Sequence, residues 1–306
     1  MDLAVYCEGL IKLYKTKDFE VLALQGLDLE VKTGELMAII GSSGSGKSTL
    51  LNMLGGLDRP TAGKVSVNGQ DMLTLVDSEL TRYKREKAGF VWQNSARNLI
   101  PYLTVRENVE FPMILSSAKG RRERAAELLD LVGLSKKHKS KIYELSGGEQ
   151  QRTAIAIAMA NNPSLLLADE PTGSVDTKTT GIIMDIFNEL HTRGHTVIIV
   201  THDLAISRKV DRVVAIRDGR VSSEYIRTHF YADTLNTIGD LRREPAETEA
   251  EEFLVIDKVG RIQLPKDYID RLGIVGGKDK VSAELSEDRI VLSKQRDSGK
   301  DRPASS

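Results

Sequence analysis

The chain has 306 residues, with 43 lysines and arginines against 44 aspartates and glutamates, and one cysteine. This length suits two domains better than one, and the even charge argues against nucleic acid as the main partner. Cys7 cannot form an internal disulfide and suits a reducing compartment. The start, MDLAVYCEG, lacks the layout of a signal peptide, and no apolar run is long enough to span a bilayer. We therefore expect a cytoplasmic protein that can dock on a membrane partner.

Strand-like and helical segments alternate from Leu3 to about Ile226. The apolar runs LMAII, FVW, LLLA and TVIIV are separated by helical stretches, which predicts an α/β fold around a buried, mostly parallel sheet. Alternating residues near the start and around GKVSVNG predict an additional antiparallel layer.

The first motif that carries chemistry is GSSGSGKS, which follows the run LMAII and precedes the helix-forming STLLNML. A strand, a glycine-rich turn and a helix in this order form a phosphate-binding loop, in which Lys47 reaches the β- and γ-phosphates and Ser48 ligates Mg²⁺. A glycine-rich turn without a ligand is the alternative, and both flanking segments argue against it. The predicted phosphate-binding residues are Gly41, Ser42, Ser43, Gly44, Ser45, Gly46, Lys47, Ser48 and Thr49.

A second glycine-rich loop, LSGGEQQR, runs from Leu145 to Arg152. Ser146, Gly147 and Gly148 leave backbone N–H groups free for an anion, and the alanine-rich run after them places a helix N-terminus at the same point. Because the chain already has a phosphate loop, the ligand of this second loop needs an explanation.

The run LLLADEPTGSVD supplies two carboxylates at the end of an apolar strand. Asp169 can hold the magnesium shell, and Glu170 beside it can orient and deprotonate an attacking water. An apolar run that ends in Asp-Glu is often only a strand leaving the core, but the phosphate loop upstream favours the catalytic interpretation.

With these motifs together, the chain from Leu3 to about Tyr225 resembles the nucleotide-binding subunit of an ABC transporter, whose signature is LSGGEQ. The resemblance implies ATP and Mg²⁺ as ligands, a P-loop ATPase with an antiparallel β subdomain and a helical signature subdomain, and a homodimer packed head to tail. In such a dimer the loop of Ser146, Gly147, Gly148 and Glu149 in one copy binds the γ-phosphate held at Lys47 of the other.

Further positions match that family. Gln93, in GFVWQN, matches a glutamine that senses magnesium and contacts the membrane subunit, and His202, in TVIIVTHD, matches a histidine that contacts the γ-phosphate. Tyr14 matches the aromatic residue that stacks on adenine, and Asp176 matches a loop that communicates across the dimer. Considered without the resemblance, the glutamine fits a solvated polar group, the histidine a structural residue and the tyrosine a packing residue.

The stretches NLIPYLTVRENVEFPM, LSGGEQQR and ADEPTGSVDTKT resemble the lipoprotein-release and macrolide-export type of this family. This implies an ATPase peripheral on the inner face of the cell membrane, which drives an integral-membrane permease and does not itself contact the transported substrate. Neither the substrate nor the direction of transport follows from these motifs.

The rest of the chain differs in composition. We expect an ATPase domain over 1–228, a solvated acidic linker over 229–252 that includes DLRREPAETEAEE, and a disordered tail over 297–306. Between them, 253–296 resembles an AbrB-like swapped-hairpin module: two strands around Val259 and Gly260, a short helix at Lys266 to Leu272, and a hairpin around Ser286 and Glu287.

Such modules interleave two chains, and many bind DNA. The small basic excess here favours dimerisation or regulation over DNA binding. A DNA-associated ABC ATPase or regulator tethered through this module remains the second candidate function. A chromosome-structuring ATPase would carry long heptads or zinc-binding cysteines, and a translation-associated one would carry two cassettes, so both are disfavoured.

Overall fold

The computed structural model describes residues 2–15, 19–203, 206, 209–227, 250–256, 260–264, 266–275, 279, 281–286 and 289–294. The chain divides into two compact units, Met1–Val255 and Ile256–Ser306, which are described here separately. No helix among these residues combines the length and the apolar character needed to cross a membrane.

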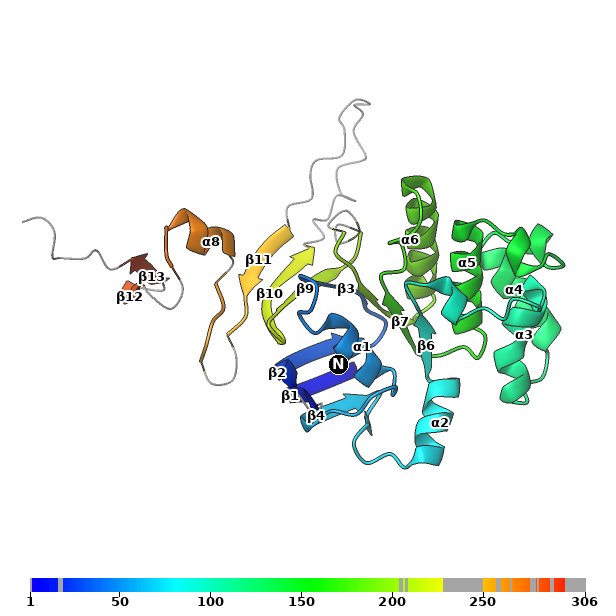
Figure 1. Cartoon of the computed structure of the whole chain (residues 1–306), viewed down its shortest axis with the longest axis horizontal. Helices are drawn as coiled ribbons and strands as arrows, with labels where there is room; N and C mark the ends of the chain where they lie inside the picture. The colour runs from blue at the N-terminus through cyan, green and yellow to red at the C-terminus, as the bar shows by residue number, and fades with distance from the viewer. Residues whose placement is uncertain are drawn as a thin grey trace, which may run out of the picture. The chain divides into compact units, whose positions relative to one another are not determined.

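The first unit is built on a mixed sheet, in which the described residues form seven strands in the order β11-β10-β9-β3-β8-β7-β6 (Figure 1). The strands from β9 to β6 are parallel, and β10 and β11 extend that sheet antiparallel at one edge. Its central strands are buried on both faces, which explains why LMAII, LLLA and TVIIV are continuous apolar runs. The predicted parallel core is therefore confirmed. Its strands are β3 (Leu36–Ile40), β6 (Ala88–Val91), β7 (Leu165–Asp169), β8 (Thr196–Val200), β9 (Arg212–Arg217), β10 (Arg220–Arg227) and β11 (Ala250–Leu254).

A second, antiparallel sheet has the order β2-β1-β4-β5, which confirms the predicted antiparallel layer. Its inner face and helix α1 share one hydrophobic core with alternate residues of the main sheet, such as Met37 and Ile39. Its strands are β1 (Leu3–Lys15), β2 (Glu20–Lys32), β4 (Ala62–Val67) and β5 (Gln70–Asp71), and α1 spans Lys47–Leu54.

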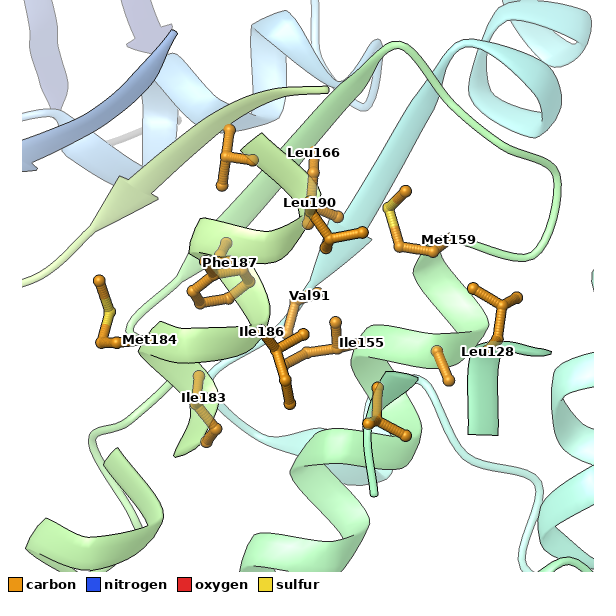
Figure 2. Packing of buried hydrophobic residues seen from close by; sticks show 14 of the residues in the cluster. Val91, Leu128, Ile155, Met159, Leu166, Ile183, Met184, Ile186, Phe187 and Leu190 are labelled. Carbon is orange, nitrogen blue, oxygen red and sulfur yellow. The ribbon is translucent and has the colours of Figure 1, made fainter. Parts of the chain in front are cut away.

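The opposite face of the main sheet is covered by helices, in a core that includes Ile155, Leu166 and Phe187 (Figure 2). Helices α3, α4 and α5 contact one another and form the expected helical subdomain, while α6 packs against β3 and β8. The helices of this unit are α2 (Asp77–Glu86), α3 (Val105–Leu115), α4 (Arg121–Leu131), α5 (Gly147–Ala158) and α6 (Thr177–Thr192), with short 3₁₀ turns at Ser95–Arg97, Ser135–Lys137 and Ile142–Glu144.

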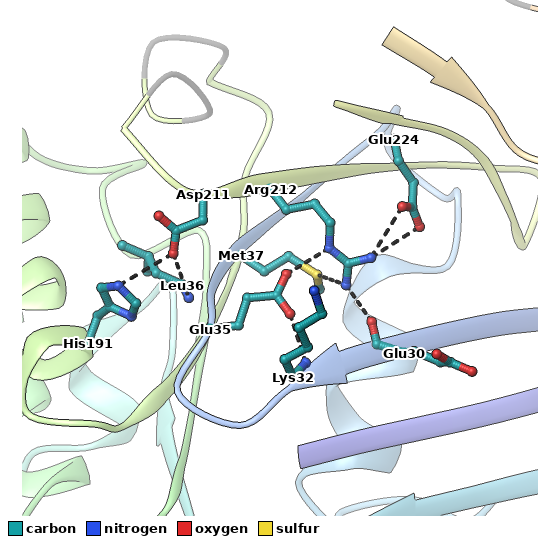
Figure 3. Close-up of polar contacts among 9 residues, drawn as sticks. All are labelled: Glu30, Lys32, Glu35, Leu36, Met37, His191, Asp211, Arg212 and Glu224. Atoms are coloured by element: carbon teal, nitrogen blue, oxygen red, sulfur yellow. Dashed lines mark hydrogen bonds and ion pairs between the residues drawn. The ribbon is translucent and has the colours of Figure 1, made fainter. Parts of the chain in front are cut away.

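One half-buried arginine, Arg212, links the two sheets at the end where β3 and β9 begin (Figure 3). Arg212 Nε lies 2.7 Å from Glu35 Oε1, its Nη1 lies 3.2 Å from Glu224 Oε2, and its Nη2 donates to the backbone carbonyl of Glu30. The guanidinium of Arg212, on β9, thus contacts residues of β2 and β10 and of the turn before β3. Because its side chain is only 16% exposed, these charge-assisted bonds satisfy a cation that would otherwise be costly to bury.

Strand β11 corrects the expected boundary between linker and module. Residues 250–252 were assigned to a solvated linker and Phe253 to the start of the module, yet Ala250–Leu254 pairs with β10, from Arg227↔Ala250 to Ser223↔Leu254. An edge strand offers unpaired backbone groups to any extended segment, and composition carries little information about such pairing. Residues 228–249 lie outside the described residues.

The second unit contains an isolated bridge between Ile256 and Ile262, helix α8 (Lys266–Arg271), and a hairpin of β12 (Val281–Ser286) and β13 (Arg289–Lys294). The predicted short helix and closing hairpin are thus present. The predicted turn residues Val259 and Glu287, and the tail over 297–306, lie outside the described residues.

Phe187, which is 0% exposed in the core beneath α6, tests this packing. We expect Phe187→Ala to lower the free energy of unfolding by about 3–5 kcal/mol, because the residue loses its burial and leaves a cavity. Phe19→Ala is the control, since Phe19 is 61% exposed, and should cost about 0.5 kcal/mol or less. Urea unfolding without nucleotide measures both, and equal losses would contradict the core position of Phe187.

Candidate functional site

A cavity of about 630 Å³ lies where β3, β7 and β8 end. In α/β sheets this edge is where ligands bind, because loops and helix N-termini converge there. The cavity is lined by Tyr14, Val21, Leu22, Ala23, Gly41, Ser42, Ser43, Gly44, Gly46, Lys47, Ser48, Thr49, Gln93, Asp169, Glu170, Val200 and His202. It therefore brings together most of the residues predicted to bind nucleotide, from segments far apart in the sequence. Ser45, which belongs to the glycine-rich loop, is buried and does not line the cavity.

The glycine-rich loop is closed around its own lysine. Lys47 Nζ donates to the carbonyl oxygens of Gly41, at 3.0 Å, and Ser42, at 2.8 Å. Gly46 precedes α1 with φ +104°, and a Cβ there would lie 2.6 Å from the carbonyl oxygen of Ala23, so only glycine fits. Helix α1 has no side-chain cap, and its first N–H groups can bind an anion.

The electrostatics of the cavity depend on Lys47 and the two carboxylates at the end of β7. Burial lowers the pKa of the Lys47 ammonium, and the charges of Glu170 and Asp169 oppose that shift. Burial raises the pKa of Asp169, as does the neighbouring charge of Glu170, against the hydrogen bond from Ser48 and the charge of Lys47. A negatively charged ligand would therefore stabilise the ammonium form of Lys47, and a cation would stabilise the carboxylate form of Asp169.

Ser48 and Asp169 provide the donor set for such a cation. Ser48 Oγ donates to Asp169 Oδ1 at 3.2 Å, which joins the first turn of α1 to the end of β7. A hydroxyl and a carboxylate oxygen beside a phosphate-binding loop match the oxygen ligands that Mg²⁺ prefers, with substrate phosphates completing its shell. These residues therefore fit the predicted ion.

Glu170 and His202 form a second pair in the lining of the cavity. His202 Nδ1 lies 2.8 Å from Glu170 Oε1, and the Glu170 N–H donates to the carbonyl oxygen of Val200 at 2.9 Å. Glu170 has φ +47°, an unfavourable backbone conformation for a non-glycine residue and one often found at functional sites. The arrangement provides a carboxylate base whose orientation is held by an imidazole.

Gln93 and Tyr14 complete the predicted lining. A Cβ on Gly173 would lie 3.4 Å from Gln93 Nε2, so the glutamine amide approaches the loop after Glu170. Tyr14 lies beside an apolar wall of Val21, Leu22 and Ala23 that our sequence reasoning missed. A signal was available, because Val21 and Leu22 begin a run of four apolar residues in a strand that alternates only from Leu27 onward, and they are 47% and 46% exposed.

The second glycine-rich loop lies outside this cavity. Ser146 caps α5: its Oγ accepts from Glu149 N at 3.3 Å, and its own N–H donates to Glu149 Oε2 at 2.9 Å. The bond from the Ser146 backbone lowers the pKa of Glu149. Asp176 caps the neighbouring helix α6 by accepting from Thr179 N at 3.0 Å, which lowers the Asp176 pKa.

These two caps are adjacent, because a Cβ on Gly148 would lie 2.5 Å from the Thr179 methyl group. None of the described residues Ser146, Gly147, Gly148, Glu149 and Asp176 lines the cavity. One chain therefore presents two distinct predicted nucleotide-binding surfaces.

Comparisons with known proteins agree with this geometry. A sequence model of the family described as ABC transporter matches residues 24–173. An ABC transporter ATP-binding protein of Thermotoga maritima, described as uncharacterized, is 48% identical over 225 residues, which is 73% of this chain and 95% of that protein. The macrolide export ATP-binding/permease protein MacB of Hyphomonas neptunium is 38% identical over 279 residues, which is 90% of this chain and 43% of that longer protein.

Among solved structures, the dimeric post-hydrolysis state of the ATP-binding cassette MJ0796 bound to ADP and Pi matches with a TM-score of 0.68 and 43% identity. The match covers 74% of this chain and 100% of that chain, and the cassette is from Methanocaldococcus jannaschii. The extent of these matches, together with the phosphate loop, the strand-end carboxylates and the signature loop, shows that the chain belongs to the ATP-binding proteins of ABC transporters and is an ABC ATPase close to the MJ0796 and MacB type.

Proposed function

We propose that this chain hydrolyses ATP as the motor subunit of an ABC transporter of the lipoprotein-release and macrolide-export type. The observation that carries the proposal is the convergence of Lys47, the Ser48–Asp169 pair and the Glu170–His202 pair on one cavity. Phosphoryl transfer to water needs a cradle for phosphates, oxygen ligands for a metal and a base for the water, and these five residues supply all three.

In this mechanism the loop amides and Lys47 bind the phosphates of ATP, and Ser48, Asp169 and Gln93 would hold Mg²⁺. When bound, Mg²⁺ would neutralise charge on the phosphate oxygens and orient the scissile bond. Lys47 now bonds the loop carbonyls of Gly41 and Ser42, so it exchanges these partners for phosphate oxygens when the nucleotide enters.

Glu170 acts as the general base and accepts a proton from the attacking water at a carboxylate oxygen. His202, whose Nδ1 lies 2.8 Å from Glu170 Oε1, fixes that carboxylate and keeps Nε2 for the γ-phosphate. Because the His202 side chain is 71% exposed and that of Glu170 only 14%, the base is shielded from bulk water while its histidine partner remains accessible.

In this proposal, two copies of the chain together form two complete ATP sites. Since the Ser146 loop does not line the cavity of its own chain, we infer that it binds the γ-phosphate held by a partner copy, with Asp176 beside it at the same interface. The solved structures of MJ0796 are described as dimeric, which supports this arrangement. Hydrolysis would then weaken an interface in which ATP is part of the contact.

We further infer that the ATPase acts on an integral-membrane permease at the inner face of the cell membrane. The MacB relative carries ATP-binding and permease functions under one name, and this chain covers 43% of its length. Gln93 follows the edge strand β6 beside the cavity, where a permease contact could report to the metal ligands. The transported substrate would meet the permease rather than this chain.

The C-terminal unit carries a second part of the proposal, that it pairs with another copy as an AbrB-like swapped hairpin. Among the residues of this unit whose exposure the structure describes, none is buried. In the hairpin Leu285 faces Ile290 across the strands, and the two side chains are 81% and 67% exposed. A two-stranded hairpin with an open apolar face is marginal in water, and a second copy would cover it.

Glu170→Gln tests the base. We expect ATP binding to persist and hydrolysis to fall about 10²-fold or more, because the amide cannot accept the proton of the water. Steady-state phosphate release measures turnover, and size exclusion should detect an ATP-trapped dimer. Glu123→Gln, an exposed change on α4, serves as the control. Near-normal turnover of the Glu170→Gln variant would remove Glu170 from this role.

Ser146→Arg tests the action of the second loop on a partner copy. Hydrolysis should be lost while isolated monomers still bind ATP, because the loop acts on phosphates held by the other chain. Mixing this variant with Lys47→Ala subunits gives a heterodimer with two composite ATP sites. One site carries both changes and the other carries neither, so part of the activity should return. Loss of ATP binding in monomeric Ser146→Arg protein would show that the loop acts within its own chain.

The hairpin face is tested by Leu285→Lys in the full chain. The nucleotide-free protein should change from dimer to monomer by light scattering, as should a chain ending at Val255, while Glu284→Lys on the opposite face of β12 should remain dimeric. A monomeric full-length parent protein would contradict the pairing. Tight, salt-sensitive binding to duplex DNA that depends on residues after Val255 would instead favour the DNA-tethered regulator.

A further inference from the structure

A charged cluster holds the hydroxyl end and one face of Tyr14. The Tyr14 hydroxyl donates to Asp58 Oδ2 at 2.7 Å, and Lys12 Nζ donates to Asp58 Oδ1 at 2.6 Å. The same ammonium lies 4.7 Å from the centroid of the Tyr14 ring. Because Lys12 and Tyr14 are two residues apart on β1, their side chains leave the same face of the strand.

Asp58 is itself fixed to the helix that follows the phosphate loop. Its N–H donates to the carbonyl oxygen of Asn52 at 3.2 Å, and its Oδ1 also accepts from Arg59 N at 2.8 Å. Through Asp58, the ring is therefore attached to α1, the element that presents Lys47 and Ser48 to the cavity.

The lysine is an unusually constrained surface cation. Its side chain is 11% exposed, and its ammonium also donates to the carbonyl oxygen of Arg59 at 2.8 Å. Burial raises the pKa of Asp58, but the hydrogen bonds from Lys12 and Tyr14 outweigh this and lower it, so the carboxylate remains charged at neutral pH. Lys12 occupies one face of the ring, and a planar ligand can take the other.

We propose that Lys12 and Asp58 are positioning residues that hold the Tyr14 ring in the orientation in which it stacks on the adenine base of ATP. A pre-oriented ring avoids the entropy cost of ordering a 38% exposed side chain when the nucleotide binds. Attachment to α1 also keeps the stacking surface and the phosphate loop at a constant separation. The inference rests on the proposed ATPase function and on the stacking of Tyr14 on adenine that the resemblance to ABC ATPases implies.

The test measures KM and kcat for ATP, and the Kd for inorganic tripolyphosphate, which has phosphates but no base. Asp58→Ala and Lys12→Met should each raise KM about two- to tenfold, with kcat and tripolyphosphate affinity unchanged. Tyr14→Ala should raise KM about 5- to 100-fold through loss of the stack. Asp77→Ala is the control, because it removes another carboxylate in contact with Arg59 and should change none of these values.

The decisive comparison repeats Asp58→Ala in a Tyr14→Ala background. A residue that acts only through the ring should have no further effect once the ring is gone. A further rise in KM there, or weaker tripolyphosphate binding in Asp58→Ala alone, would show a structural role in α1 and overturn the inference. If Tyr14→Ala leaves KM unchanged, the stacking assignment itself fails; if it raises KM while Asp58→Ala and Lys12→Met do not, only the positioning role fails.

Discussion

The architecture of this protein depends on one constraint, the burial of parallel strands on both faces. Strands β3, β7 and β8 have apolar side chains on either side, between the core shared with the antiparallel sheet and the core beneath the helices. Charged groups are therefore excluded along their length and appear where each strand ends. Since parallel strands end at one edge, residues from distant parts of the sequence meet there without any local sequence relation. The same constraint places the Arg212 network at the other edge, where the strands begin.

This constraint explains how much of the site could be predicted. Long apolar runs precede Asp169, Glu170 and His202. The apolar pattern alone therefore predicts that these residues lie where the parallel strands end and ligands bind. The hydrogen bonds of Asp58 could not be predicted in this way, because it lies 44 residues from Tyr14 in the sequence and meets it only through the register of β1 and the end of α1. The start of β11 at Ala250 could not be predicted for a different reason: its pairing uses backbone groups, and the acidic residues Glu251 and Glu252 are poor indicators of a strand.

The capped starts of helices α5 and α6 explain how the signature loop is held in one conformation. Ser146 and Asp176 each use a side-chain oxygen to satisfy the first amides of their own helix, and Gly148 allows the two helix starts to approach closely. A larger residue at Gly148 would separate them. Local bonds within a single chain thus order the loop, so the proposed contact with a second copy would cost little further entropy.

The pairing of β11 with β10 also bears on the chain between them. Arg227 and Ala250 are paired neighbours, so the two ends of the chain between them are fixed at one place in the sheet. The covalent path from the sheet to the second unit therefore begins only after Leu254. Because both ends are paired, doubling the number of residues between Arg227 and Ala250 would cost about 0.6 kcal/mol of closure entropy, which the pairing of β10 with β11 would have to offset. An insertion into the acidic stretch would therefore weaken the hold on β11 without lengthening the connection to the second unit.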